Sequence, residues 1–343
     1  MTKILYNFVV RIGLSLLISI LLLACACEEH RADLKNAKPA AQNSSQATAP
    51  VDVSLKTTAS AAPAPSTPPA PTVTVPKVSG EKAMQYTREV TAFGSRPIGS
   101  AAHKRLQAYL RDHLKNDNLE EDTFTAQTPA GPFQMTNFIA KFPGTKDGIV
   151  VISGHYDTVY SLKNFVGAND GGSSTGLPLA LADVLRQHKE GRPTVWLVWF
   201  DGEEAVQQWS ATDSTYGSRH LAQKWQADGT LPKIKAFLLL DMIGDADLDI
   251  QRESNSTSWV EDMVGQAASK LGYSSHFFAR EMAVEDDHLP FVHLGVPSAD
   301  IIDLDYGPNN SWHHTSKDTI DKVSPKSMEI VGNVVLQVVW DMK

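Results

Sequence analysis

The chemistry in this 343-residue chain is concentrated at two adjacent carboxylates, Glu203 and Glu204. They follow the apolar run 194–200, which has the composition of a buried strand. Adjacent side chains on an extended or turning backbone diverge, so the two glutamates can have separate roles. We expect Glu204 to bind a metal cation, because an anionic oxygen neutralises its charge, and Glu203 to act as a general acid or base. An exposed acidic pair at a helix start is the alternative interpretation.

Other side chains could complete a metal site without sulfur. Cys25 and Cys27 are the only cysteines, so the folded domain can have neither a disulfide nor a thiolate ligand. A catalytic zinc would then be held by imidazole nitrogens and carboxylate oxygens, with one coordination position open. Each candidate alone would more often be a turn residue, a helix cap or a core histidine, but together they indicate a site. The candidate ligands are His155, Asp170, Glu204, Asp241 and His314.

The elements that must position these residues alternate along the chain from about residue 80. This alternation predicts one α/β domain with a mixed, mostly parallel central sheet flanked by helices. Each of the apolar runs 148–154, 194–200 and 236–240 is followed by an acidic residue or a histidine at or just beyond its C-terminal end. Open α/β sheets bind ligands at this end of their strands. The other expected elements are helices over 81–91, 101–114, 174–188, 258–271 and 325–340, an antiparallel strand pair over 120–126 and 135–142, and a strand over 299–304.

The N-terminus has the pattern of an export signal. Residues 1–27 combine basic residues with an apolar stretch, and Leu22-Leu23-Ala24-Cys25 resembles a bacterial lipoprotein cleavage site. Cys27 is the second choice for the processed residue, and an ordinary cleaved signal is the alternative. Residues 28–79, which are rich in Ala, Pro, Ser and Thr, read as a disordered tether to a catalytic domain over 80–343. We expect a cell-envelope protein that is lipid-anchored to a membrane, or otherwise periplasmic or secreted.

The formal net charge is −8, and no basic stripe is present. We therefore expect no nucleic acid partner.

The motifs around the candidate ligands resemble those of the zinc aminopeptidase family that also contains the animal-type glutaminyl cyclases. The resemblance covers the chain from about residue 80 and implies a zinc-aminopeptidase-like fold. The motifs that carry it are His155-Tyr156-Asp157, Gly167-Ala168-Asn169-Asp170, Glu203-Glu204, Asp241-Met242-Ile243-Gly244, Asp287-His288 and His314-Thr315.

A narrower resemblance is to the glutaminyl cyclases themselves. It rests on the segment from Asp201 to Ala205, on Trp209, on the run from Asp213 to Ala222, and on the doubled acid that begins at Asp286. The resemblance implies one zinc bound by Asp170, Glu204 and His314, a proton shuttle at Glu203, a hydrogen-bonded carboxyl pair of Asp241 and Asp286, and a substrate pocket walled by Trp209.

One departure affects the pocket. Animal cyclases place a tryptophan directly before the ligand histidine, whereas here that position is His313 and Trp312 comes one earlier. Trp312 and His313 are therefore further candidates for the substrate pocket, and His313 is an alternative ligand.

The resemblance implies that the N-terminal glutamine of a peptide or protein is cyclised to pyroglutamate with release of ammonia. It also implies that the enzyme binds one zinc ion. The rival activity is a two-zinc aminopeptidase in which Asp170 bridges the metals, His155 and Asp241 complete the second site, and Glu203 activates water. Asp157 is expected at that second site, as a ligand or beside one. A third interpretation is a lipid-anchored binding domain that keeps the scaffold without activity.

Overall fold

The computed structural model describes residues 74–343. The expected signal peptide and most of the expected tether lie outside this part of the chain. Within the described residues, no helix is long and apolar enough to span a membrane.

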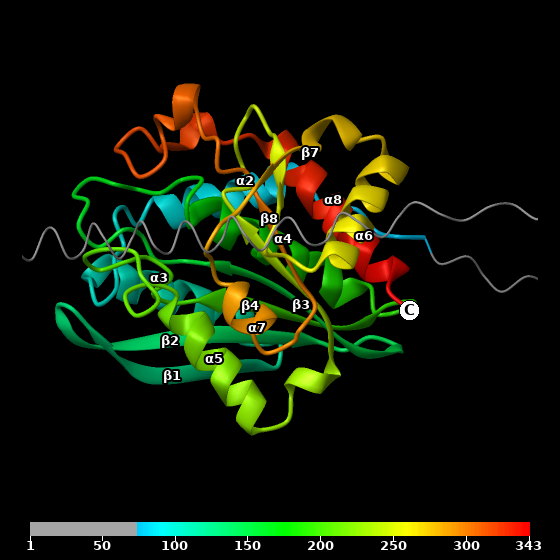
Figure 1. Ribbon diagram of the computed structural model, residues 1–343, viewed down its shortest axis with the longest axis horizontal. Coiled ribbons are helices and arrows are strands. Elements are labelled where there is room, and N and C mark those ends of the chain that lie inside the picture. Colours follow the sequence, from blue (N-terminus) through cyan, green and yellow to red (C-terminus); the bar gives the residue numbers. More distant parts are fainter. Residues whose placement is uncertain (1–73) are drawn as a thin grey trace, which may run out of the picture. The chain divides into compact units, whose positions relative to one another are not determined.

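One six-stranded sheet forms the centre of the domain (Figure 1). Its strands, in spatial order, are β1 (Leu119–Thr128), β2 (Gly131–Phe142), β4 (Pro193–Phe200), β3 (Lys146–His155), β5 (Ile234–Asp241) and β8 (Ser298–Ile302). The pairings of β1 with β2 and of β2 with β4 are antiparallel, whereas β4, β3, β5 and β8 run parallel. The prediction of an α/β domain with a mixed, mostly parallel sheet is confirmed.

Helices cover both faces of this sheet, as buried parallel strands require. One hydrophobic core contains residues of α2 (Gly80–Thr91), α3 (Ala101–Leu114), α4 (Gly172–Gln187), α6 (Ser258–Leu271) and α8 (Pro325–Asp341). On the other face, α5 (Tyr216–Ala227) and the short α7 (Leu289–Val292) pack in front of the strands in Figure 1. Outside the main sheet lie a parallel pair, β6 (Ile250–Glu253) and β7 (Phe277–Met282), and four short 3-10 helices, Leu231–Lys233, Ser274–His276, Pro308–Asn310 and Ile320–Lys322.

Local sequence explains where the first two helices begin. The Ser79 hydroxyl accepts a hydrogen bond from the Lys82 amide, and the Ser100 hydroxyl accepts one from the His103 amide. Such serine caps satisfy amides that have no partner within the helix. The helices expected over 81–91 and 101–114 are therefore found with nearly the same bounds.

The packed part of the chain begins slightly before residue 80. Val78 is buried against Gly332 of α8, and its amide donates to Asn333 Oδ1 at 3.1 Å. Val75 is half-buried against the same core. The segment is poor in large apolar residues, so its composition does not indicate that these two valines are core positions.

The start of α4 is a close contact with the end of β3. Gly171 precedes the helix with φ 77°, and a Cβ there would lie 2.5 Å from the Asp157 carbonyl oxygen. Glycine is the residue that adopts this left-handed conformation without steric cost. Asp170, one residue earlier, is thereby held beside the C-terminal end of β3.

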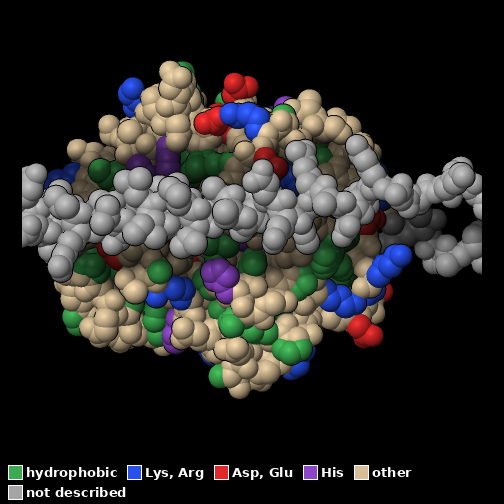
Figure 2. Space-filling model, viewed as in Figure 1, with side chains coloured by type: hydrophobic (Ala, Val, Ile, Leu, Met, Phe, Trp, Pro, Cys, Tyr) green, Lys and Arg blue, Asp and Glu red, His purple; other side chains and the backbone are tan. Residues whose placement is uncertain are grey.

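The acidic and basic side chains that Figure 2 leaves uncovered are interspersed on this face of the molecule.

Candidate active site

The candidate residues meet at the C-terminal edge of the parallel strands. His155 ends β3, Asp241 ends β5, and the two glutamates follow the end of β4. His314 lies in the loop between β8 and α8 and has φ 48°. Because parallel strands bring their carboxyl ends to one edge, segments far apart in sequence come together here.

Asp170, Glu204 and His314 form one cluster. His314 Nε2 lies 3.2 Å from Asp170 Oδ2 and 3.5 Å from Glu204 Oε2. Ligand atoms bound tetrahedrally at about 2.0–2.1 Å from zinc lie about 3.3 Å apart, so these separations fit one ion. Asp170 Oδ2 and Glu204 Oε1 are buried and have no hydrogen-bond partner among the described residues. The donor set, two carboxylates and an imidazole, suits zinc and leaves one position open.

His155, Asp170 and Asp241 form a second cluster that shares Asp170 with the first. His155 Nε2 lies 3.2 Å from Asp170 Oδ1 and 3.2 Å from Asp241 Oδ1. Asp241 Oδ1 also accepts a hydrogen bond of 2.9 Å from the Ser174 hydroxyl. These residues offer donors for a second cation, but Asp241 also has a hydrogen-bonding role within the protein.

The pKa values in the first cluster reflect crowded buried carboxylates. Burial and the charge of Asp170 raise the pKa of Glu204 to about 7. Burial lowers the pKa of His314, but its close contacts with the carboxylates of Asp170 and Glu204 outweigh it and raise that pKa to about 11. A bound cation would relieve the repulsion between the carboxylates that these shifts report.

Asp157 separates the roles of the two glutamates. Its Oδ1 accepts a hydrogen bond from the Glu203 amide at 3.1 Å, and its Oδ2 accepts one from the Glu204 amide at 3.4 Å. With both oxygens turned to the backbone of this loop, Asp157 orients the pair; Oδ1 lies 3.7 Å from His155 Nδ1. Asp157 was expected either to be a metal ligand or to lie beside one, and these contacts favour the second role.

Glu203 has the environment of a proton carrier. Burial raises its pKa well above the ordinary value; the His155 charge opposes this, and the charges of Glu204 and Asp286 add to it. A carboxyl group whose pKa is raised in this way can hold and release a proton nearer to neutral pH.

Asp286 is a further buried acid beside this group. Burial and then the charge of Asp241 raise its pKa well above the ordinary value. Its Oδ1 accepts the Asp287 amide at 2.5 Å, and its Oδ2 has no hydrogen-bond partner among the described residues. The charge of Asp241 thus acts on Asp286, and the expected hydrogen bond between these two carboxyl groups stays a prediction.

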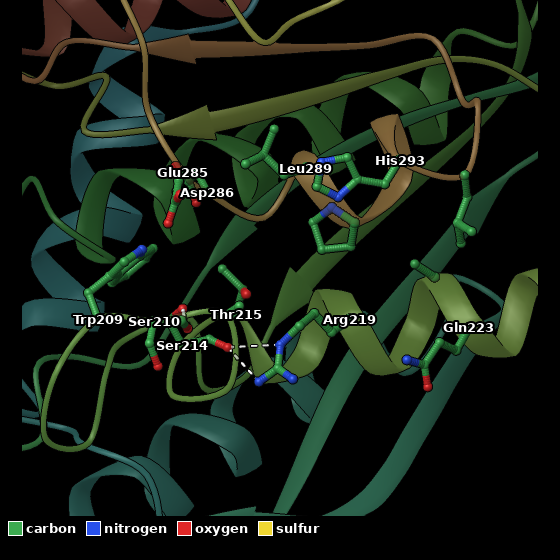
Figure 3. Close-up of a pocket in the computed structure, with 14 residues that line it drawn as sticks. Trp209, Ser210, Ser214, Thr215, Arg219, Gln223, Glu285, Asp286, Leu289 and His293 are labelled. Carbon is green, nitrogen blue, oxygen red and sulfur yellow. Dashed lines mark hydrogen bonds between the residues drawn. The ribbon is translucent and has the colours of Figure 1, made fainter. Parts of the chain in front are cut away.

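Trp209 lies across a cavity of about 360 Å³ from Asp286 (Figure 3). The loop that carries it is organised by Asp213, whose carboxylate accepts the amides of Val206, Gln207 and Gln208, each at 2.9 Å. The structure therefore places Trp209 at the wall of a cavity that reaches the acidic cluster.

Trp312 lies elsewhere and does not border this cavity. It packs edge-on against Tyr306, with ring centroids 5.4 Å apart, and against Gly307. His313 is nearer to the metal cluster, since its ring centroid lies 4.0 Å from that of His314 and it can offer a ligand atom together with Asp170 and His314. Neither residue lines the cavity that Trp209 borders, because Trp312 packs against Tyr306 and His313 lies beside His314.

Arg96 is a positioning residue that the sequence did not reveal. It is fully buried and donates hydrogen bonds to the carbonyl oxygens of Tyr156 (2.9 Å), Val166 (2.5 Å) and Gly167 (2.9 Å). Burial lowers its pKa to about 10, and nearby carboxylates, Asp318 first, oppose that shift. Arg96 thereby ties the loop that leads to Asp170 to the end of β3. Arg96 lies in a segment rich in turn-forming residues, and nothing in that segment indicates that its side chain is buried.

A second group of buried polar side chains was not expected from the sequence. His288 Nε2 lies 3.0 Å from Glu253 Oε2, and its Nδ1 lies 3.7 Å from Asp300 Oδ2. All three side chains are buried, and no pattern in the sequence joins residues from β6, the α7 cap and β8.

Comparisons with known proteins point to one family. A model of peptidase family M28 matches residues 137–339. A solved glutaminyl cyclase from an Acidobacteriales bacterium is 49% identical, covers 80% of this chain and 97% of its own, and superposes with a TM-score of 0.78. The glutaminyl-peptide cyclotransferase of Drosophila melanogaster is 30% identical over 64% of this chain and 69% of its own length. A solved Zn-dependent exopeptidase from Parabacteroides distasonis is 25% identical with a TM-score of 0.71, covering 78% of this chain and 100% of its own.

Proposed function

The chain belongs to peptidase family M28 and, within it, to the glutaminyl cyclases, and we propose that it is a zinc-dependent glutaminyl-peptide cyclotransferase. The substrate is a peptide or protein whose first residue is glutamine. Its α-amine attacks the side-chain amide carbon, a five-membered lactam forms, and ammonia leaves. The M28 family match and the cyclase relatives support an enzyme of this kind.

The protein side chains supply the proton transfers. Glu203 takes a proton from the attacking nitrogen and returns it to the departing amide nitrogen, so that one carboxyl group serves as base and then as acid. Asp286, whose charge acts on Glu203, and Asp241, whose charge acts on Asp286, stabilise the charge that moves during these steps. Holding amine and amide in one pocket makes ring closure an intramolecular reaction, which favours it strongly.

Asp170, Glu204 and His314 are the residues that would hold the zinc ion. A bound zinc would supply a Lewis acid for the side-chain amide oxygen. The observation that carries the cyclase assignment is Asp286, a buried acid that borders the cavity and whose charge acts on Glu203.

Aminopeptidase activity is the second candidate because of the cluster His155, Asp170 and Asp241. Incubation with one Gln-initiated and one Leu-initiated peptide separates the two activities. The cyclase releases ammonia and forms pyroglutamate from the first peptide and leaves the second intact. Release of free leucine without cyclisation would overturn the proposal.

Metal content provides an independent measurement. We expect one tightly bound zinc per chain, determined by elemental analysis of protein purified without chelators. Two tightly bound zinc ions per chain would favour the aminopeptidase, since water activation in that reaction uses both clusters.

We also propose that the protein is exported and lipid-anchored through Cys25. The support is the basic and apolar N-terminal pattern that ends in Leu22-Leu23-Ala24-Cys25. In a bacterial host fed a labelled fatty acid, wild-type protein would carry label in the membrane fraction and Cys25→Ala would not. Label retained in Cys25→Ala but lost in Cys27→Ala would move the assignment to Cys27.

A further inference from the structure

The cavity beside Asp286 extends well beyond the acidic cluster. Trp209 and Asp286 lie at one end, and Gln223 of α5 lies at the other (Figure 3). Its volume of about 360 Å³ is within the range of small-ligand pockets, about 300–1,000 Å³. Three other cavities within residues 74–343 are bordered by none of the candidate catalytic or metal-binding residues.

The lining of this cavity is mainly apolar. It is formed between α5 and the α7 region, and its apolar members include Trp209, Ala222, Leu289, Pro290 and Leu294. Leu289, Pro290 and Leu294 are only half-buried, so they offer apolar surface that the fold itself does not cover. Such surface gains free energy when an apolar side chain displaces its water.

Four ionisable residues also border the cavity, namely Arg219, Glu285, Asp286 and His293, and Arg219 is held by contacts within the protein. Its Nε and Nη2 donate to the Ser214 carbonyl oxygen at 3.1 and 2.7 Å (Figure 3). Its guanidinium also lies 5.0 Å from the centroid of the Tyr216 ring. These contacts hold Arg219 against the protein.

The reaction itself indicates what occupies this space. A cyclase modifies only the first residue, and the second residue stays attached to it in substrate, transition state and product. Asp286 belongs both to the reacting cluster and to the cavity wall, so the cavity starts where the peptide chain must continue.

We propose that this cavity binds the side chain of the residue that follows the N-terminal glutamine, and that it selects an apolar residue there. The inference rests on the proposed cyclase function. Because the second residue is bound equally before and during ring closure, its contacts lower KM and leave kcat nearly unchanged.

Steady-state kinetics with three peptides tests the inference. For wild-type protein we expect the KM of Gln-Leu-Ala to be about tenfold below that of Gln-Gly-Ala, at similar kcat, since an apolar contact of this size discriminates by about that factor. Gln-Lys-Ala should resemble Gln-Gly-Ala. The variants Leu289→Ala and Leu294→Ala, at different places in the cavity, should each reduce the tenfold ratio to about threefold.

Leu271→Ala is the matched control, because Leu271 is also a half-buried leucine but lies at the end of α6, away from the cavity. It should keep the wild-type ratio. Equal KM values for Gln-Leu-Ala and Gln-Gly-Ala, a lower KM for Gln-Lys-Ala, or an unchanged ratio in both cavity variants would overturn the inference while the cyclase function stands. Failure of wild-type protein to cyclise any of the three peptides would refute the cyclase function itself.

Discussion

Asp157 accounts for how two neighbouring glutamates can point to different partners. By accepting the amides of both Glu203 and Glu204, it fixes the backbone of a short loop and with it the directions of the two side chains. Glu204 reaches His314, whereas Glu203 lies 3.8 Å from His155 Nδ1 and near Asp286. A metal ligand and a proton carrier can thus be adjacent in sequence.

The first prediction concerns Glu203. Glu203→Gln removes the titrating group but keeps its size, so cyclisation should fall at least about a hundredfold while zinc content is unchanged. Activity and elemental analysis on the same preparation check this. If the variant loses zinc, the roles of Glu203 and Glu204 have been exchanged.

The second prediction separates the two neighbouring histidines. His314→Ala should abolish both tight zinc binding and activity, because His314 Nε2 faces both Asp170 and Glu204. His313→Ala is the matched control and should retain one zinc per chain. Loss of zinc in His313→Ala alone would make His313 the ligand.

At the scale of elements, α3 is joined to the end of β4 by a buried polar contact. His103 Nε2 lies 2.7 Å from Asp201 Oδ1, and the other carboxylate oxygen accepts the Thr136 amide of β2 at 2.8 Å. Asp201 is the residue that leads from β4 to the glutamates. The contact therefore sets the start of the catalytic loop as well as the position of α3.

The third prediction is a pH dependence of stability at this contact. Burial lowers the pKa of His103, but Asp201 outweighs burial, and the net pKa is raised. A raised pKa in the folded state stabilises the protein fully below the unfolded value of about 6.5, and this contribution disappears as pH rises through the folded pKa. His103→Gln should therefore lose more unfolding free energy at pH 6 than at pH 9, by about 2 kcal/mol.

Denaturant unfolding at the two pH values measures that difference. His188→Gln, at an exposed histidine after α4, serves as the control and should lose the same small amount at both. If the loss of unfolding free energy in His103→Gln does not vary with pH, the histidine acts only through packing.

At the scale of the whole molecule, the chain before α2 is part of the fold. Val78 packs against α8, although the residues of α8 are far from Val78 in the sequence. The domain therefore holds its N-terminal approach segment against its last helix.

The fourth prediction tests this attachment. A chain beginning at residue 80 should be less stable than one beginning at residue 74 by about 4 kcal/mol, from the lost burial of Val78, its amide hydrogen bond and the Ser79 cap of α2. Val78→Ser in the longer chain keeps the amide bond and the cap, so it should reproduce only the part that comes from side-chain burial, about 2 kcal/mol. Equal unfolding free energies for the two chains would show that residues 74–79 contribute nothing.

Much of this organisation could be predicted from the sequence. The apolar runs that became β3, β4 and β5 are continuous because those strands are buried on both faces, and the acids and histidines that follow them had to meet at one edge. Residue type then identified the carboxylates and imidazole that suit zinc.

The tertiary structure alone decided which groups support that site. Arg96, Asp318 and the cluster of Glu253, His288 and Asp300 are polar side chains buried through contacts with distant segments, for which no local periodicity exists. It also directed Trp312 away from the cavity and placed Leu289 and Leu294 beside α5. The sequence by itself determined the six strands of the main sheet, their order of appearance and the chemical types at their ends, because these depend on local composition; it did not indicate β6 and β7. Burial, pKa values and the shape of the substrate cavity depend on which remote segments pack together, and only the folded chain sets those.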